Sequence, residues 1–301
     1  MTLTAATSAA LAAAGLDPQR VERLIVTALD EDLGDGLDIT SLATVPFDAE
    51  GVADFVARKP GVIVGLPVVR AVLELVTDDS VVITEHVADG AKVAAGELVL
   101  SAQALVRALL TAERTSLNIL CHLSGIATVT REWVDAVAGT SARILDTRKT
   151  NPGLRALEKY AVRCGGGTNK RMGLYDAALI KDNHVLAAGG VAEAFRAVRE
   201  LFPDVEVQVE CDTVEQVREA IEAGATFLLL DNMGVDELRA SVSLVAGRAE
   251  LEATGGLSLD RARAVAETGV DYLSVGALTH SAPVLDVGVD LRPYELPSGG
   301  D

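Results

Sequence analysis

Six short apolar runs in the second half of the chain constrain its fold more than any other feature of the sequence. The runs are RILD, AALIKD, VEVQVE, FLLLD, AELEAT and DYLSVG. Their last positions of functional interest are Asp146, Lys181, Glu210, Asp231, Thr254 and Gly276, and successive positions lie 35, 29, 21, 23 and 22 residues apart. Each step has the length of a strand, a loop and a helix, which predicts parallel strands joined by right-handed crossovers. Six or seven such units can wrap into an open barrel related to the (β/α)8 type.

The first third of the chain predicts a smaller α/β region. Residues 17–33 have helical spacing, with Asp17 as the N-cap and Pro18 at the first helical position. Short strand-like runs follow: GVADFVARK, GVIVGL, SVVITEHV and GELVL. The stretch ADGAKVAAGE has glycines at two turn positions and predicts a hairpin-like corner. It is faintly similar to lipoyl and biotinyl carrier domains, but it lacks the hairpin context of the lysine that those domains modify.

A long helical stretch at residues 104–139 joins the two regions. Its leucines fall at spacings that give one apolar face: Leu105, Leu109, Leu110, Leu117 and Leu120. The pair Ser124-Gly125 predicts a break into two helices. We therefore expect an N-terminal α/β domain (1–116), a barrel catalytic domain (117–284) and a tail (285–301) that returns to the first domain.

Composition excludes several classes of protein. Acidic residues outnumber basic ones by 44 to 26, so a nucleic-acid-binding surface is not expected and the excess is attributed to solubility. Cys121, Cys164 and Cys211 form no CxxC pair, which disfavours a disulfide framework or a zinc site and is typical of a reducing cytoplasm. No apolar run reaches the roughly 20 residues of a membrane span, and the apolar N-terminus lacks the basic start of a signal peptide.

The scarce cations gather at the predicted barrel loops and on the helix before them. They are Arg114, Arg148, Lys149, Lys170, Arg171 and Lys181. At an effective dielectric of about 20, two cations 4 Å apart repel by roughly 4 kcal/mol, so such a gathering predicts a ligand with several negative charges. Arginine matches carboxylates and phosphates with paired hydrogen bonds. The alternative is that each cation pairs with a local acid on a solvated surface.

Two acids and two glycine motifs follow later strands. Glu210 and Asp231 could hold Mg²⁺, bond sugar hydroxyls or stabilise positive charge on a ribose ring. The alternative is helix N-capping, because Asp212-Thr213 and Asp231-Asn232 both precede predicted helices; it explains Asp212 well and Glu210 poorly. The motifs Thr254-Gly255-Gly256 and Ser274-Val275-Gly276 predict a phosphate-binding corner. The residues thus indicate a small, sugar-phosphate-containing, polyanionic ligand.

Longer runs resemble the quinolinate phosphoribosyltransferase family. They are ERTSLNILCHLSGIAT, DTRKTNPGLRALEKYAVRCGGGTNKR, AALIKDNHV, LLLDN, ATGGLS and DYLSVGALTHS, and the likeness extends from about Ile25 to Leu291. The resemblance implies Mg²⁺-dependent transfer from phosphoribosyl pyrophosphate to quinolinate, giving nicotinate mononucleotide, pyrophosphate and CO2 in NAD biosynthesis. It also implies an N-terminal α/β sandwich-like domain joined to an open, seven-stranded α/β barrel.

The resemblance further implies site residues and an assembly. Quinolinate would bind Arg114, Arg148, Arg171 and Lys181, with Lys149 beside them. We predict catalytic roles for Lys149, Glu210 and Asp231, and the two acids as Mg²⁺ ligands, directly or through water or substrate. The other expected substrate-binding residues are Thr147, Lys170, Thr254, Gly255, Gly256, Ser274, Val275 and Gly276. The smallest active unit would be a homodimer in which Arg114 reaches the neighbour's site, with a hexamer left open.

The chain departs from the family pattern at Lys170, where histidine is usual, and more mildly at Thr254, where serine is usual. Lysine replaces a titratable ring by a full charge on a flexible stem. Two interpretations stay open: a tolerated variant, or a paralogue that acts on another pyridine or aromatic acid. A third hypothesis, from another class, is a non-catalytic sensor of anionic metabolites.

Overall fold

The computed structural model describes residues 2–34, 36–77 and 80–293, and these form two compact units. The first unit contains the described residues up to 129 together with 152–165 and 282–293. The second contains residues 130–151 and 166–281. The chain passes from the first unit to the second after residue 129, whereas the sequence analysis placed this division after residue 116. The tail returns to the first unit as far as Pro293, and the rest of the predicted tail, 294–301, lies outside the described residues.

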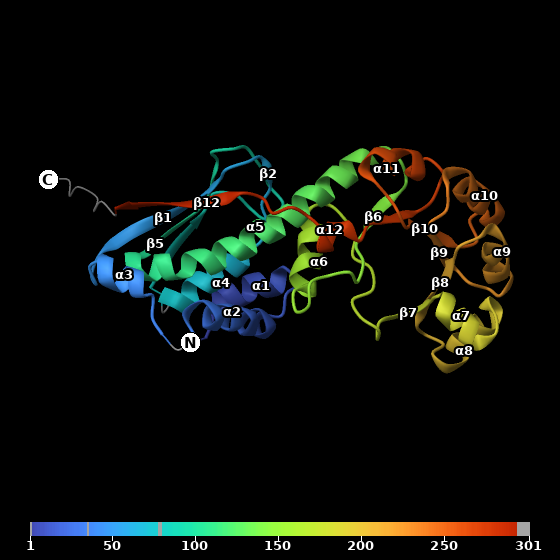
Figure 1. Ribbon diagram of the computed structural model, residues 1–301, viewed down its shortest axis with the longest axis horizontal. Coiled ribbons are helices and arrows are strands. Elements are labelled where there is room, and N and C mark those ends of the chain that lie inside the picture. The colour runs from blue at the N-terminus through green and yellow to red at the C-terminus, as the bar shows by residue number, and fades with distance from the viewer. Residues whose placement is uncertain (1, 35, 78–79, 294–301) are drawn as a thin grey trace. The chain divides into compact units, whose positions relative to one another are not determined.

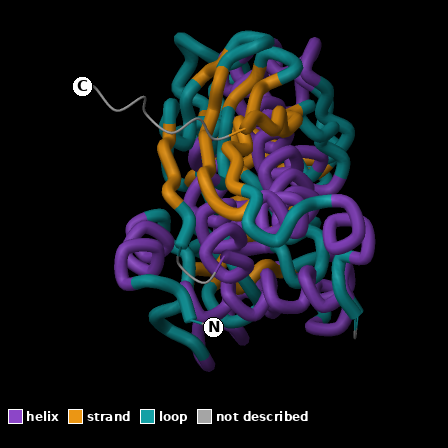
Figure 2. Tube along the Cα trace, turned by 90° about the vertical axis from the view of Figure 1, so that its left-hand side faces the viewer, coloured by secondary structure: helices purple, strands orange, loops and turns teal. Residues whose placement is uncertain are grey.

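The first unit is an antiparallel sheet with helices packed beside it (Figures 1 and 2). Its strand order is β12-β1-β5-β3, formed by Val287–Pro293, Glu50–Ala57, Leu98–Leu105 and Val82–Glu85. A separate short pair joins β2 (Gly61–Val62) and β4 (Lys92–Val93). The helices are α1 (Ala5–Ala13), α2 (Pro18–Leu33), α3 (Ile39–Thr44), α4 (Leu66–Thr77) and α6 (Arg155–Cys164).

Local signals in this unit act as predicted. The Asp17 carboxylate accepts hydrogen bonds from the backbone N–H groups of Gln19 and Arg20 and so begins α2. Gly90 and Gly96, the glycines of the predicted corner, have φ of +89° and +86°. These values lie in the left-handed region, which glycine adopts at little cost.

The long helix α5 (Val106–Ala136) is continuous, so the predicted break at Ser124-Gly125 is wrong. Gly125 serves close packing instead of helix termination. A Cβ placed on it would lie 2.1 Å from the carbonyl oxygen of Pro283 and 2.9 Å from Cα of Val284. Ser124 Oγ accepts a hydrogen bond from the backbone N–H of Val64 (2.9 Å). Both residues therefore let α5 pack closely against backbone segments of the same unit, and the helix continues without a break through this position.

The second unit is an open parallel barrel, which confirms the predicted fold class. Each of the six apolar runs forms a strand, and all pairings are parallel in the order β6-β11-β10-β9-β8-β7. The strands are β6 (Arg143–Leu145), β7 (Ala177–Ile180), β8 (Glu206–Cys211), β9 (Phe227–Asp231), β10 (Glu250–Thr254) and β11 (Tyr272–Ser274).

Helices alternate with these strands and lie outside them (Figure 1). They are α7 (Asp182–Ala188), α8 (Val191–Leu201), α9 (Val214–Glu222), α10 (Val235–Val245), α11 (Leu259–Ala266) and α12 (Ala277–His280). Leu228 and Leu230 are fully buried on one side of β9, whereas Asp231 at its end is partly exposed. In the described ranges, no helix is both long enough and apolar enough to cross a membrane.

The expected seventh strand is reduced to a single bridge. Thr168 pairs in parallel with Leu145, next to β6, and its N–H donates to the carbonyl of Ile144 (2.8 Å). Among the described residues, no pairing joins Thr168 to β7, so the sheet does not close. We call the region between the Thr168 bridge and β7 the seam of the barrel.

Candidate active site

A cavity of about 410 Å³ lies at the carboxyl ends of the barrel strands, wholly within the second unit. It gathers most of the predicted site residues: Thr147, Arg148, Lys149, Lys170, Arg171, Lys181, Glu210, Asp231, Thr254, Ser274 and Gly276. Gly255, Gly256 and Val275 follow these lining residues in the chain, and Val275 is buried. Arg114 is exposed on the part of α5 that belongs to the first unit.

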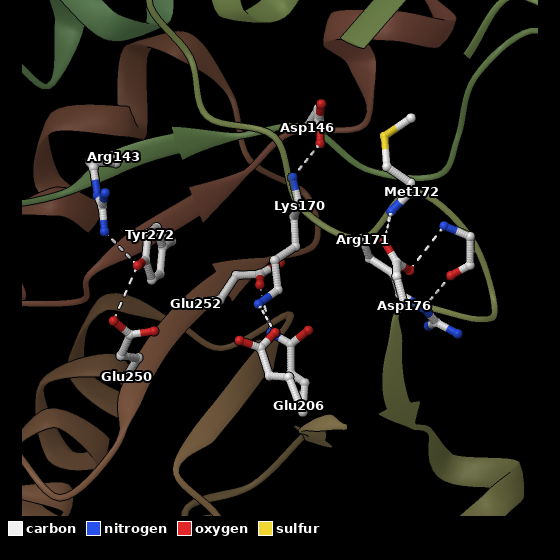
Figure 3. Close-up of polar contacts among 12 residues, drawn as sticks. Arg143, Asp146, Lys170, Arg171, Met172, Asp176, Glu206, Glu250, Glu252 and Tyr272 are labelled. Carbon is white, nitrogen blue, oxygen red and sulfur yellow. Dashed lines mark hydrogen bonds and ion pairs between the residues drawn. The ribbon is translucent and has the colours of Figure 1, made fainter. Parts of the chain in front are cut away.

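Two arginines lie close to each other at this cavity. Burial lowers the pKa of Arg171, and the neighbouring charge of Arg148 lowers it further. Arg171 Nε donates to the carbonyl of Gly173 (2.8 Å). Burial acts to raise the pKa of Asp176, but hydrogen bonds from the N–H groups of Met172 and Gly173, together with Arg171, lower it overall. The ionised Asp176 therefore holds the turn that follows Arg171 (Figure 3).

A lysine and an acid neutralise each other on the cavity wall. Lys181 Nζ lies 2.5 Å from Glu210 Oε2, and the two side chains are 49% and 10% exposed. The backbone N–H of Lys181 donates to His184 Nδ1 (3.0 Å), which fixes the start of α7. His184 therefore holds the backbone of Lys181 in place at the start of α7. An incoming anion can take over the lysine, because the ammonium is half exposed.

Asp231 lies in a turn built against the first glycine motif. Asn232 Nδ2 donates to Asp231 Oδ2 (2.8 Å), and the N–H of Asn232 donates to the carbonyl of Thr254 (3.0 Å). A Cβ on Gly255 would stand 2.2 Å from Asn232 Oδ1, and the residue has φ of +83°. Only glycine fits there, so the predicted motif keeps the turn beside Asp231 tight.

The N-cap alternative for the acids is not supported. Helix α10 has Gly234 as its N-cap, so Asp231 is free of that role. The expectation that Asp212 caps α9 is also wrong: Thr213 is the N-cap, and its Oγ1 accepts from the N–H of Gln216 (3.3 Å). The Gln216 side chain in turn accepts from the N–H of Thr213, which is the reciprocal arrangement of a capping box.

Gly276 allows two basic side chains to approach the end of β11. A Cβ at Gly276 would lie 2.9 Å from Lys149 Cδ and 3.2 Å from His280 Nε2. The N–H of Lys149 donates to Thr147 Oγ1 (3.0 Å), and its carbonyl accepts from Thr279 Oγ1 (2.8 Å). Sequence reasoning missed His280, although its place just after the last strand was a usable signal.

Sequence reasoning also missed polar residues deeper in the barrel. Gln208 and Glu252 line the cavity together with Asp146, which the sequence had already marked as a strand end, and Gln208 Nε2 donates to Glu252 Oε2 (2.6 Å). Burial raises the pKa of Glu252, and hydrogen bonds from Ser274 and Gln208 offset this only in part. The signal was present: in VEVQVE and AELEAT, polar residues alternate with apolar ones, and alternate residues of a strand face the same side.

Lys170 directs its ammonium away from the carboxyl ends of the strands. Nζ pairs with Glu206 and lies 3.6 Å from the ring centroid of Phe227, and these are the first residues of β8 and β9. Its backbone N–H donates to Asp146 Oδ1 (2.9 Å). Figure 3 shows the side chain extending from Asp146 toward Glu206 and Glu252, apart from Arg171 and Asp176.

The acids can contribute to a metal site only together with a ligand. The described residues contain no group of three or more histidine, cysteine, aspartate or glutamate side chains that could hold a metal ion by themselves. Mg²⁺ commonly takes one or two carboxylates and completes its shell with water and substrate phosphates. Glu210 and Asp231 line the same cavity and fit that partial role.

A parallel barrel with a cavity of opposed cations and acids at its carboxyl end defines the class: an α/β-barrel enzyme whose substrates are anionic. Comparison with known proteins identifies the family within this class. Residues 38–124 match the N-terminal domain of quinolinate phosphoribosyl transferase, and residues 126–290 match its C-terminal domain. The chain belongs to the quinolinate phosphoribosyltransferase family.

Individual relatives are similar in sequence or structure to about nine tenths of this chain. The nicotinate-nucleotide pyrophosphorylase [carboxylating] of Mycobacterium leprae is 53% identical over 268 residues, which is 88% of this chain and 94% of that protein. The probable enzyme of the same name from Bacillus subtilis is 42% identical and covers 87% and 90%. The solved nicotinate-nucleotide pyrophosphorylase of Francisella tularensis superposes with a TM-score of 0.87 at 38% identity, covering 91% and 96%.

Proposed function

We propose that the protein transfers the phosphoribosyl group of phosphoribosyl pyrophosphate to quinolinate and releases CO2, pyrophosphate and nicotinate mononucleotide. The observation that carries this proposal is one cavity that brings Arg148, Lys149, Arg171 and Lys181 together with Glu210 and Asp231. The names of the relatives support it, since they are called carboxylating pyrophosphorylases or decarboxylating quinolinate phosphoribosyltransferases. The reaction belongs to de novo NAD biosynthesis.

The cationic side of the cavity is suited to the two carboxylates of quinolinate. Arg148 and Arg171 are close enough for each to feel the other's charge, so a dianion between them relieves a repulsion. Lys181 leaves Glu210 as the anion binds, and the freed carboxylate then faces the ribose. Because the ring is held by fixed forks, its nitrogen is oriented for attack before the reaction begins.

The acidic side is suited to the ribose. As pyrophosphate departs, positive charge develops on the sugar ring, and Glu210 and Asp231 stabilise that charge or hold the ribose hydroxyls. Thr254–Gly256 and Ser274–Gly276 offer bare backbone for the 5′-phosphate, and Lys149 lies beside Gly276 to add a positive charge. When bound by the two acids and the phosphates, Mg²⁺ would offset the charge that grows on pyrophosphate.

Decarboxylation follows from the same arrangement. After the pyridine nitrogen bonds to the ribose, the ring carries a positive charge that favours loss of the adjacent carboxylate as CO2. The electron pair of the broken bond stays on the ring carbon, which then takes a proton from water. Arg148 and Arg171 hold the ring in place during this step. Positioning and electrostatics thus account for the chemistry without a covalent enzyme intermediate.

We also propose a homodimer in which Arg114 serves the neighbouring subunit's cavity. In its own chain Arg114 is exposed in the first unit, whereas the cavity lies in the second. The segment around α3 supports an interface, because Leu37, Ile39 and Phe47 are 71%, 79% and 76% exposed. Further assembly to a hexamer stays open.

The three cysteines are free thiols, which supports our proposal of a cytoplasmic location.

The experiment that tests the function uses the purified protein with Mg²⁺, phosphoribosyl pyrophosphate and quinolinate, and follows CO2 and nicotinate mononucleotide. Nicotinate serves as the parallel control acid. Turnover with quinolinate and none with nicotinate is the expected result. Turnover of phosphoribosyl pyrophosphate with another pyridine or aromatic acid, but not with quinolinate, would establish the paralogue instead. Binding of both substrates without pyrophosphate release would establish a sensor.

A further inference from the structure

We propose that Lys170 is a positioning residue that braces the seam of the barrel, and that its ammonium does not contact the substrate. The inference rests on the proposed function for its kinetic test, but its structural basis is independent of that function. Lys170 lies two residues after the Thr168 bridge, on one side of the seam. Its partners Glu206 and Phe227 begin β8 and β9, beyond β7 on the other side.

The ammonium lies far from the chemistry that the carboxyl ends of the strands would perform. Glu206 and Glu210 share one face of β8 and are four residues apart, which corresponds to roughly 13 Å along a strand. Lys170 itself lines the cavity, but Glu206, which its ammonium contacts, does not, whereas Glu210 does. The Lys170 side chain is 19% exposed, compared with 49% for Lys181. The long, flexible stem of lysine lets the ammonium reach Glu206 although the backbone of Lys170 is bonded to Asp146.

The backbone on the near side of the seam depends on this brace. Asp146 is 1% exposed and accepts from Asn169 Nδ2 (2.6 Å) and from the N–H of Lys170 (2.9 Å). These bonds fix the start of the loop, and the pair with Glu206 ties the same loop to the other side. Arg171 comes next in the chain and lies beside the like charge of Arg148. A loosened loop would let the two guanidinium groups move apart.

The brace combines contacts that are weak singly. Glu206 is 52% exposed, so an ion pair there is screened by water. The ring of Phe227 adds a cation–π contact on a buried face. Loss of either partner should therefore weaken substrate binding several-fold and leave the chemical step nearly intact.

The decisive test compares Glu206→Gln with Lys170→Met. If Lys170 is a brace, each variant raises the KM for quinolinate about fivefold and changes kcat less than about twofold, because ground-state positioning is lost. The double variant should be no worse than Lys170→Met alone, since that change already removes the ion pair with Glu206. Lys170→Arg keeps the charge and the reach and should retain most of the affinity.

The opposite pattern would overturn the proposal. If the ammonium binds substrate, Glu206→Gln releases it from a competing acid, and the KM for quinolinate falls or stays unchanged while Lys170→Met alone raises it. The matched control is Glu193→Gln, because Glu193 is 51% exposed and pairs with Arg196 on α8. That variant should leave both kinetic constants unchanged.

A second readout does not depend on activity. Hydrogen exchange of peptides spanning residues 168–173 should be faster in Lys170→Met and in Glu206→Gln than in the unmodified chain, and unchanged in Glu193→Gln. Faster exchange without any turnover of quinolinate would uphold the brace and reject the proposed function. Normal turnover with unchanged exchange would reject the brace.

Discussion

At the scale of single residues, the cavity is organised by contacts that keep like charges together. Arg171 is held by the carbonyl of Gly173, and the turn behind it is held by Asp176. Such an arrangement stores repulsion between Arg148 and Arg171 that an anion relieves. We therefore expect the site to favour ligands that bring two negative groups to one place.

Replacing Arg171 by methionine should weaken quinolinate binding strongly, because a partly buried guanidinium group loses its charge and its hydrogen bond to Gly173. A truncated charged partner in such a site costs about 2–5 kcal/mol, so KM for quinolinate should rise at least about 30-fold. Steady-state kinetics with saturating phosphoribosyl pyrophosphate measures it. Arg218→Met, on the exposed face of α9, is the control and should behave like the unmodified chain.

Glu252→Gln should stabilise the protein at neutral pH. Burial raises the pKa of Glu252 in the folded chain, so the fold favours the protonated form. The stability that this carboxyl contributes is full below its unfolded pKa and is lost as pH rises through the higher folded pKa. The melting temperature of the variant should therefore exceed that of the unmodified chain at pH 7 and match it near pH 3. A lower melting temperature at pH 7 would contradict the assignment.

At the scale of secondary structure elements, contacts between distant backbone segments determine where a helix or strand ends, even where the local sequence predicts a different end. Helix α5 passes through a Ser-Gly pair without a break, and the seventh strand of the barrel shrinks to one bridge at Thr168. In both places the deciding partner is distant in sequence: Pro283 packs on Gly125, and Leu145 pairs with Thr168.

Gly125→Ala tests the role of that glycine in α5. In an isolated helix the change favours helix formation by about 1 kcal/mol. Here the added Cβ would meet the Pro283 carbonyl at 2.1 Å, so the variant should lose about 2–3 kcal/mol and unfold several degrees lower. Gly234→Ala is the control, because its Cβ would meet nothing nearer than Glu237 Oε2 at 3.4 Å. Equal or higher stability of Gly125→Ala would refute the packing argument.

At the scale of the whole molecule, the cations that line the cavity belong to a chain with a formal net charge of −18. Such a field gives solubility but does not attract anions, so the local cluster must provide the binding. One of the predicted cations, Arg114, belongs to the first unit. Its proposed use by a neighbouring subunit makes the dimer the active species.

Mixing two inactive variants tests that proposal. Arg114→Ala and Lys149→Ala should each lose most activity as homodimers. In a mixed dimer, the cavity of the Arg114→Ala subunit keeps Lys149 and receives an intact Arg114 from its partner. Co-refolded or subunit-exchanged mixtures should therefore regain up to about one quarter of the unmodified activity, since half of the dimers are mixed and each has one intact site. A mixture as inactive as its components would show that Arg114 acts within its own chain.

The sequence by itself determined the order of elements and the chemistry of the strand ends. Its apolar runs and their spacing predicted all six parallel strands. Glu210, Asp231 and Lys181 were singled out because charges inside a core are costly, and the three residues do line one cavity at the strand ends. The glycine motifs were predicted as a phosphate-binding corner, and that role stays a prediction; the structure adds that Gly255 has a conformation and a close contact that other residues do not tolerate.

The tertiary structure alone decided where the long side chains reach and which backbones touch. Lys170 was grouped with the substrate-binding cations because it neighbours Arg171, yet its ammonium pairs with Glu206 across the seam. A flexible stem can direct its charge to either end of a barrel, and only the positions of distant strands settle the direction. The continuity of α5 and the open seam likewise depend on contacts between segments far apart in the chain, which no local pattern records.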